Sequence, residues 1–508
     1  MRFPRASGIL LHPTSLPGPT GIGELGPAAY RFVDFLARSG QKLWQILPLG
    51  PTGYGNSPYG CYSAFAGSPF LISLELLIKQ GLLPYSCLEA FSHLPTGKVD
   101  YSAHWELKEK LLQQAFQTFR STASAEQRQS FRGYCEAPHI AAWLEDYALF
   151  MALKVAHGGK PWTEWEPAFA KRDGRAIHQV QERLAESIWF QRFVQWLFDS
   201  QWAELRRYAH KKGVEIVGDI PIYVSDDSAD VWANPQMFFL DEQGRSTVVA
   251  GVPPDYFSKT GQRWGNPLYR WDYCERTQFV WWIQRFRVLF ARVDRVRLDH
   301  FRGFEAYWEI PAAEKTAING RWVPGPGPRL FRALEKSMGV MPIIAEDLGI
   351  ITPEVESLRD EFLFPGMRIL QFAFGGDSKN PYLPHNYVPN AAVYTGTHDN
   401  DTLVGWLNAE KPEVIEKVRA YLGVEAQASL PWHLIRLAQS SVADTCVIPL
   451  QDIMELDTTA RMNTPSAEEG NWMWRFEEGQ LTEAHSSRLL ELSVRYSRAL
   501  PADSNALL

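Results

Sequence analysis

Four acidic residues stand at the ends of short apolar runs that are typical of buried strands. Two carboxyl groups with unequal pKa values can cleave a glycosidic bond, and a third acid can orient the charged sugar ring of the transition state. A single acid at such a place often caps the following helix, whereas four acids on one rim favour catalysis. The four are Asp219 in Val-Gly-Asp-Ile-Pro, Asp299 in Arg-Leu-Asp-His, Glu346 in Ala-Glu-Asp and Asp399 in Thr-His-Asp-Asn-Asp.

Asp299 and Glu346 are the candidates for opposite protonation states. Arg297 precedes Asp299 by two residues and therefore shares its face of a strand, where the guanidinium favours the carboxylate form. A carboxyl group that must stay protonated needs apolar burial or a carboxylate neighbour, and Glu346 beside Asp299 would have the neighbour. We therefore expect Asp299 to be a nucleophile and Glu346 to be a general acid.

Histidines in the same segments allow a rival interpretation. His300, His398, Asp399 and Asp401 are of residue types that commonly bind metal ions. The chain lacks a local His-x-His or HExxH cluster, and Arg297 beside Asp299 would repel a cation. We expect no metal and no cofactor, and a further possibility is that both histidines are hydrogen-bonded barrel residues.

Aromatic side chains in Gly/Pro-rich loops are candidates for binding sugar. Pyranose rings present apolar C–H faces that pack on aromatic rings. Each aromatic residue taken alone is more often part of a core, but a position in a loop over the rim favours binding. The candidates are Tyr54, Tyr59, Tyr256, Phe257 and Trp264.

The candidate site residues lie far apart in the sequence, so the fold must bring them to one rim. The apolar runs predict such a fold. Near-continuous hydrophobicity indicates strands buried on both faces, and most runs are followed by helical periodicity. Eight such units predict an α/β fold, a (β/α)8 TIM barrel, in which active sites lie at the C-terminal ends of the strands. The runs are Gly8–His12, Leu43–Leu49, Val214–Asp219, Val296–Asp299, Pro342–Glu346, Met367–Phe374, Ala392–Thr397 and Thr445–Gln451.

Two connections between the runs are too long for a single barrel helix. We expect one catalytic domain over residues 1–508, with a mostly helical insertion at 51–212 and a second insertion at 225–292. The second contains Gly, Pro and aromatic residues, which predicts a loop-rich lid followed by a barrel helix. About 55 residues follow the last run, too few for a C-terminal β-sandwich domain.

Composition excludes several classes of protein. The chain has 508 residues, with 51 Lys and Arg against 58 Asp and Glu, and a net charge of −7 argues against binding nucleic acid. No stretch of 18 apolar residues predicts a membrane span, and the start lacks the apolar region of a signal peptide. Five scattered cysteines are read as reduced thiols of a cytoplasmic protein: Cys61, Cys87, Cys135, Cys274 and Cys446.

Taken together, the motifs resemble glycoside hydrolase family 77, the 4-alpha-glucanotransferases of the alpha-amylase clan. The likeness extends over nearly the whole chain. It is carried by Leu-Leu-His-Pro-Thr-Ser-Leu-Pro from Leu10, Pro-Leu-Gly-Pro-Thr-Gly-Tyr-Gly from Pro48, Ser-Pro-Tyr from Ser57, Ser-Ala-Phe-Ala-Gly from Ser63, Gly-Val-Pro-Pro-Asp-Tyr-Phe-Ser from Gly251, Gly-Gln-Arg-Trp-Gly-Asn-Pro from Gly261, Arg-Leu-Asp-His-Phe-Arg-Gly from Arg297, Ala-Glu-Asp-Leu-Gly from Ala345 and Gly-Thr-His-Asp-Asn-Asp from Gly396.

The resemblance implies transfer of an α-1,4-glucan segment to the 4-hydroxyl of an acceptor glucan or glucose, by a retaining double displacement, with hydrolysis as a minor side reaction. The implied partners are maltooligosaccharides, amylose and fragments of glycogen or starch. It implies Asp299 as nucleophile, Glu346 as acid/base and Asp399 as transition-state stabiliser. It also places Arg297, His300 and His398 around the sugar, with Asp219 nearby. The other implied glucan contacts are a lid that carries Tyr256, Phe257, Gln262 and Trp264, a contact at Tyr59, and a second, outer glucan site at Tyr54.

Two other classes remain open at this point. A glucan hydrolase would use the same acids but need no acceptor, and a non-catalytic glucan-binding protein would not need a nucleophile. The wider amylase pattern has an Asn-His pair in the third strand, whereas here Asp219 is followed by Ile-Pro-Ile-Tyr. That departure favours a transferase over an amylase.

Overall fold

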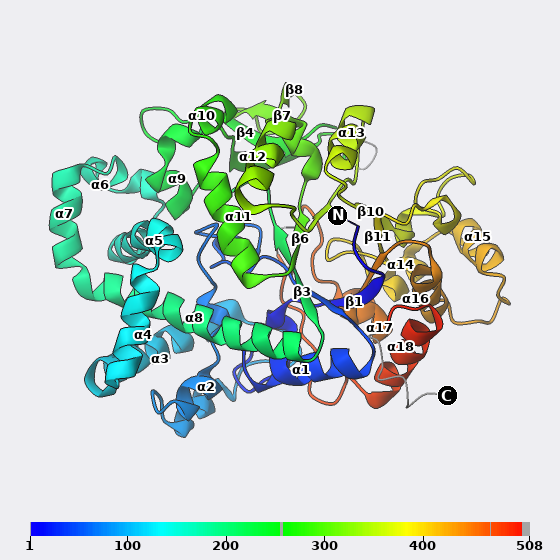
Figure 1. The fold of residues 1–508 in the computed structure, drawn as a ribbon, viewed down its shortest axis with the longest axis horizontal. Coiled ribbons are helices and arrows are strands. Elements are labelled where there is room, and N and C mark those ends of the chain that lie inside the picture. The colour runs from blue at the N-terminus through cyan, green and yellow to red at the C-terminus, as the bar shows by residue number, and fades with distance from the viewer. Residues whose placement is uncertain (1, 255–257, 468, 500–508) are drawn as a thin grey trace.

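Eight parallel strands close into a barrel at the centre of the molecule (Figure 1). The structure is a computed structural model, and it describes residues 2–254, 258–467 and 469–499. Each of the eight predicted runs overlaps a barrel strand, which confirms the (β/α)8 fold. Around the barrel the strands follow chain order: β1 (Ala6–Leu10), β2 (Leu43–Gln45), β3 (Glu215–Ile220), β6 (Arg295–Leu298), β9 (Ile343–Ala345), β10 (Gly366–Ile369), β11 (Ala391–Tyr394) and β12 (Thr445–Pro449).

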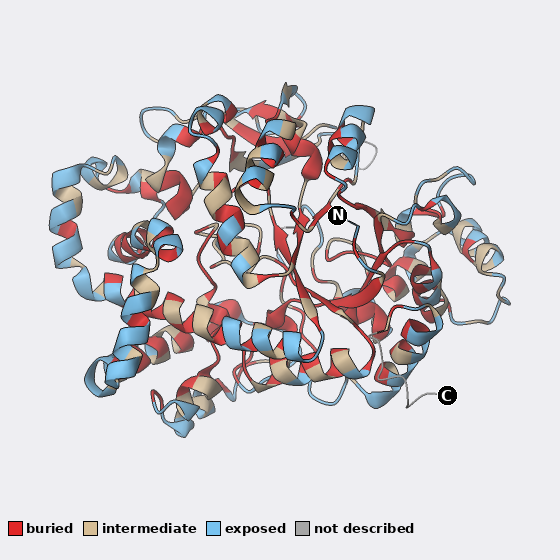
Figure 2. Cartoon of the chain, in the orientation of Figure 1, coloured by how far each residue is buried: buried red, intermediate tan, exposed pale blue. Residues whose placement is uncertain are grey.

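The barrel closes between its first and last strands. β1 and β12 pair in parallel from Ala6 with Thr445 to Leu10 with Pro449, and every residue of both strands is buried. Gly8 allows β2 to approach, because a Cβ at this position would lie 2.3 Å from Cβ of Leu43. The residues of the barrel strands are largely buried (Figure 2), and their apolar members belong to the hydrophobic core.

Helices surround the barrel and bury one face each against it. In α11, Trp282, Phe286 and Val288 are buried, while the helix ends at Arg292 with a basic last turn. Outward faces of the surrounding helices are exposed (Figure 2). The helices that follow or cover the strands are α1 (Pro27–Arg38), α8 (Ala185–Lys211), α11 (Val280–Arg292), α12 (Pro328–Met338), α13 (Pro353–Glu361), α14 (Leu403–Ala409), α15 (Pro412–Leu422), α16 (Pro431–Ser440), α17 (Leu450–Ile453) and α18 (Glu483–Arg495).

The connection between β2 and β3 builds a helical region beside the barrel (Figure 1). Ser124 and Gln127 form a capping box at the start of one of its helices. Lys108, whose side chain is fully buried, pairs with Glu24 and donates to the carbonyl oxygen of Ile72, 2.5 Å away, which ties this region to the barrel loops. Its helices are α2 (Leu74–Lys79), α3 (Tyr101–Thr122), α4 (Ala125–Glu136), α5 (Pro138–Ala156), α6 (Pro167–Ala170) and α7 (Gly174–Arg183).

A four-stranded antiparallel sheet lies beyond the C-terminal end of β6. Its order is β5-β4-β7-β8, so it combines strands from two separate barrel connections. Residues 225–292 thus contain two paired short strands, short helices and the barrel helix α11, and the connection after β6 supplies the other two strands of the sheet. Its elements are α9 (Ala229–Ala233), β4 (Val248–Val252), β5 (Gln262–Pro267), α10 (Trp271–Arg276), β7 (Ala306–Pro311) and β8 (Arg321–Pro324).

Two further observations concern the whole described chain. None of the described helices is both long and apolar enough to cross a lipid bilayer. All five cysteines are free thiols, and Cys274 and Cys446 are buried.

Candidate active site

A cleft opens at the C-terminal ends of the barrel strands and brings three of the four acids together. Asp299 and Glu346 directly follow the neighbouring strands β6 and β9, which pair from Val296 with Ile343 to Leu298 with Ala345. Asp399 reaches the same cleft from the loop after β11. Of the other predicted site residues, the cleft is lined by Tyr59, Gln262, Trp264, Arg297, His300 and His398.

Arg297 is the buried cation of the site and binds two carboxylates at once. Its Nη2 lies 2.8 Å from Asp299 Oδ1, and its Nη1 donates to both oxygens of Asp219 at 3.0 and 2.8 Å. Burial alone would lower the pKa of Arg297, but the two carboxylates hold that pKa well above its ordinary value. The guanidinium therefore keeps its charge and fixes the orientation of Asp299.

Glu346 is held by main-chain donors of two different loops. Its Oε2 accepts from His300 N at 2.7 Å, and its Oε1 accepts from Leu348 N at 2.9 Å. Burial raises the pKa of Glu346 to about 8, with a further contribution from the Asp299 carboxylate, against the opposing effects of Arg297 and the two N–H groups. A protonated Glu346 at neutral pH agrees with expectation, although burial matters more than the carboxylate neighbour we had invoked.

The environment of Asp399 favours the ionised carboxylate, in contrast to that of Glu346. Burial would raise its pKa, but His398, whose Nε2 lies 3.3 Å from Oδ2, and Asn463, whose Nδ2 donates to Oδ1 at 2.7 Å, hold the pKa well below its ordinary value. Arg461 also donates to the Asp399 carbonyl oxygen at 2.6 Å. Asp399 is therefore a fixed negative charge in the cleft.

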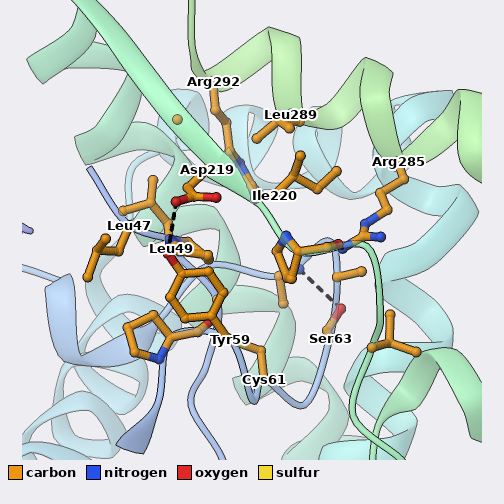
Figure 3. A pocket seen from close by; sticks show the side chains of 18 of the residues that line it. Leu47, Leu49, Tyr59, Cys61, Ser63, Asp219, Ile220, Arg285, Leu289 and Arg292 are labelled. Carbon is orange, nitrogen blue, oxygen red and sulfur yellow. Dashed lines mark hydrogen bonds between the residues drawn. The ribbon is translucent and has the colours of Figure 1, made fainter. Parts of the chain in front are cut away.

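Asp219 is one of the four acids that we expect at this rim, but it is not among the residues that line the cleft. Its side chain is fully buried beneath Arg297 and accepts a 2.8 Å hydrogen bond from the Tyr59 hydroxyl. It faces a second pocket, where Figure 3 shows the Tyr59 hydroxyl directed at Asp219 and Arg285 and Arg292 reaching in from α11. Burial raises the pKa of Asp219 to about 6. We therefore assign Asp219 an indirect role, through Arg297.

The sheet supplies one wall of the cleft. Trp264, on β5, places its ring against the ring of His300, with centroids 4.8 Å apart and planes at 83°, and its Nε1 donates to Gln262 Oε1 at 3.1 Å. Burial lowers the pKa of His300 to about 4, so this imidazole is neutral at pH 7. Tyr256 and Phe257 lie outside the described residues. Tyr54 is fully exposed and away from the cleft.

Several lining residues were missing from the predicted site, although Arg302 belongs to one of the motifs that carry the resemblance. Asn463, which fixes Asp399, belongs to an irregular segment far from any strand run. Trp472 lies 5.9 Å from both Tyr59 and His398, measured between ring centroids. Arg302 lies 3.7 Å above the ring centroid of Trp322 at the wall formed by β8. All of them meet the acids only through the folded chain.

The rival metal interpretation has no geometric support among the described residues. They contain no group of three or more His, Cys, Asp or Glu side chains that is arranged to hold a metal ion. Asp401 instead accepts from the Thr458 hydroxyl at 2.8 Å, and His398 stacks on Tyr59 with centroids 5.1 Å apart.

Comparisons with known proteins identify the family of the chain. A family model described as 4-alpha-glucanotransferase, glycoside hydrolase family 77, matches residues 11–482. The chain is 51% identical to the 4-alpha-glucanotransferase of Thermus thermophilus over 505 residues, covering 98% of this chain and 100% of that protein, and 51% identical to that of Synechocystis, covering 98% of each. The amylomaltase of Streptococcus agalactiae, solved in complex with acarbose, superposes with a TM-score of 0.94 at 39% identity, covering 98% of this chain and all of that one.

Proposed function

The chain belongs to the 4-alpha-glucanotransferases of glycoside hydrolase family 77, and from this premise we propose how its cleft performs the transfer. The protein is a glycosyltransferase of the amylomaltase type. It moves a segment of an α-1,4-glucan from a donor to the 4-hydroxyl of an acceptor glucan or glucose by a retaining double displacement. The observation that carries the proposal is the contrast between Asp299, bound to the Arg297 guanidinium, and Glu346, whose pKa is raised to about 8.

The first displacement uses both members of this pair. Glu346 gives its proton to the glycosidic oxygen while an Asp299 oxygen attacks the anomeric carbon, so the bond to the leaving glucan breaks as the bond to Asp299 forms. The products are a free glucan with a 4-hydroxyl and a covalent glucosyl-enzyme. Arg297 keeps the carboxylate oriented for the attack because it is itself fixed by Asp219.

The second displacement reverses the proton transfer. Glu346, now ionised, takes the proton of the acceptor 4-hydroxyl, and that oxygen displaces Asp299 from the anomeric carbon. Two inversions restore the α-configuration. Asp399 remains ionised throughout and stabilises the positive charge that develops on the sugar ring in each transition state.

Transfer must compete with water, which is always the more concentrated nucleophile. Trp264 and the neutral His300 form an aromatic wall beside Glu346, and a bound acceptor on this wall would displace water from the intermediate. Hydrolysis is then a minor side reaction. Gln262 and Tyr59 are placed to contact glucan in the same cleft, and Tyr256 and Phe257 are proposed to continue the lid.

The remaining assignments extend this proposal to the whole chain. Its substrates would be maltooligosaccharides, amylose and fragments of glycogen or starch, with a second, outer glucan site at the exposed Tyr54. Residues 1–508 would act as one catalytic domain, whose insertions at 51–212 and 225–292 shape the cleft. We place the enzyme in the cytoplasm, in keeping with its free thiols.

One experiment tests both the reaction and the roles. The protein is incubated with maltotriose and no cofactor, and the products are separated by length; glucose together with maltopentaose and longer chains is expected. Glucose and maltose without longer chains would identify a hydrolase instead.

The variant Glu346→Gln tests the acid role. Its rate of maltotriose turnover should fall about 10² to 10⁴-fold. The rate of its first step with an α-maltosyl fluoride donor should fall much less, because fluoride leaves without a proton. Equal losses on both donors would contradict the acid role.

A further inference from the structure

The loop that carries His398 and Asp399 is fastened at both of its ends to one buried carboxylate. Asp452 Oδ2 accepts from the Thr395 hydroxyl at 2.6 Å, where the chain leaves β11. Asp452 Oδ1 accepts from the main-chain N–H of Leu403 at 2.7 Å, where α14 begins. We call residues 395–402 the catalytic loop.

Internal hydrogen bonds make the catalytic loop a single unit. Asn400 Oδ1 accepts from both N and Oγ1 of Thr397 at 2.9 Å each, and Thr397 Oγ1 in turn accepts from Asp399 N at 3.2 Å. Gln371 Nε2 donates to the Asp401 carbonyl oxygen at 2.7 Å. A shift at either end of the loop would therefore displace Asp399 as well.

Asp452 itself lies behind the loop and not among the residues that line the glucan cleft. It belongs to α17, directly after β12, and its residue is 1% exposed. Together with His12, His398 and Arg461 it lines a separate, small pocket. Asp452 therefore contacts the catalytic loop without lining the cleft that holds the three acids.

Burying a carboxyl group at this position costs free energy of folding. No cationic side chain among the described residues forms an ion pair with Asp452, and burial, with a further contribution from Asp401, raises its pKa to about 7. An apolar residue would avoid this cost but would leave the Thr395 hydroxyl and the Leu403 N–H without a partner. The carboxyl group is thus suited to one task, which is to accept from both ends of the loop.

We propose that Asp452 is a positioning residue for Asp399, and that its two hydrogen bonds fix the catalytic loop where Asp399 faces the anomeric carbon. The inference rests on the proposed role of Asp399 in the transfer reaction. It adds a residue that touches neither substrate nor reacting atoms, and it links the last barrel strand to the chemistry at the rim.

Substitutions of Asp452 can separate the effect of its two hydrogen bonds from the effect of its charge. In Asp452→Asn the amide oxygen can still accept from Leu403 N, and the amide nitrogen can donate to Thr395 Oγ1, so the clamp is preserved. Asp452→Ala removes both bonds. Thr395→Val removes the hydrogen bond from the Thr395 hydroxyl with little change of shape. This variant replaces Asp452→Ala in the test if the alanine variant does not fold.

The experiment measures kcat and KM for maltotriose disproportionation by these variants. We expect kcat of Asp452→Ala to fall by about 10²-fold, because small misplacements of catalytic groups cost this much, with KM within about twofold of wild type. Thr395→Val should lose less, and Asp452→Asn should retain most of the activity. An unchanged kcat in folded Asp452→Ala, or in Thr395→Val where the alanine variant is unfolded, would overturn the proposal. So would equal losses in Asp452→Asn and Asp452→Ala.

A double variant tests whether the effect passes through Asp399. Turnover of α-maltosyl fluoride is compared for Asp399→Asn alone and for Asp399→Asn combined with Asp452→Ala. If Asp452 acts by positioning Asp399, the second substitution causes little further loss; an undiminished loss would overturn the proposal. Full activity of Asp399→Asn alone would instead refute the proposed role of Asp399, so the two failures are distinguishable.

Discussion

The main-chain N–H of His300 donates a 2.7 Å hydrogen bond to Glu346 Oε2, so the residue next to the proposed nucleophile holds the proposed acid. His300 adopts the left-handed conformation, with φ of 50° and ψ of 49°, where the chain turns from β6 into the 3-10 helix Phe301–Phe304. Because the donor is a backbone N–H group, this bond fixes the position of the Glu346 carboxyl group relative to the chain segment that carries Asp299.

The protonation state of Glu346 predicts the alkaline limit of activity. The first displacement needs the protonated acid, and the pKa of this group is raised to about 8. Values of kcat/KM for maltotriose should therefore fall as pH rises through about 8. Measurement from pH 6 to 10 checks this, and a plateau extending to pH 9.5 would contradict it.

The same group predicts a pH-dependent cost in stability. The folded protein keeps the Glu346 proton up to about pH 8, whereas the unfolded chain loses it near the ordinary pKa of 4.5, so folding stability falls as pH rises between these values. Glu346→Gln removes this dependence. The variant should gain in melting temperature relative to wild type at pH 8 and gain much less at pH 5. The prediction fails if the difference between the two proteins is the same at both pH values.

The buried position of Asp219 predicts a change in kcat rather than KM. Asp219→Asn keeps the shape of the side chain but weakens its hold on Arg297, which then orients Asp299 less well. We expect kcat for maltotriose to fall about tenfold, equal to about 1.4 kcal/mol of transition-state stabilisation, with KM little changed. A raised KM with unchanged kcat would instead indicate direct contact with glucan.

The wall formed by Trp264 predicts the balance between transfer and hydrolysis. In Trp264→Ala the wall beside His300 is lost, and water can reach the glucosyl-enzyme. The ratio of reducing ends released to longer glucans formed from maltotriose should rise about threefold or more, since acceptor orientation contributes a few kcal/mol at most here. Trp264→Phe is the matched control and should stay near wild type. An unchanged ratio in the alanine variant would argue against this role of the wall.

The buried Lys108–Glu24 pair predicts a large loss of stability far from the cleft. Lys108→Met leaves the Glu24 carboxylate without its cation and should cost about 3 kcal/mol, measured by urea unfolding. Adding Glu24→Gln should restore part of this loss, because the uncompensated charge is removed. A loss below about 0.5 kcal/mol in the single variant would show that the pair is not a significant source of stability.

The barrel was predictable from the sequence because its signals are local. Each buried parallel strand is a short apolar run, and the acids that end the runs at Asp299 and Glu346 indicate the rim directly. The resemblance of the motifs then supplied a function that periodicity alone does not provide.

The features that the sequence did not predict depend on contacts between distant segments of the chain. β4 and β7 pair although they lie in different barrel connections, and their short strands contain Gly and Pro, so nothing in either segment marks the partner. Asn463 and Asp452 act on the catalytic loop from beyond the last strand. The burial that governs Glu346 is likewise a property of the assembled cleft.

The pairing of β1 with β12 determines when a newly made chain can work. The first strand leaves the ribosome with no neighbour on one side, and it acquires that neighbour only after residue 449 has been synthesised. The groups that fix Asp399 come even later, at residues 452 and 463. Nascent or prematurely terminated chains should therefore lack activity.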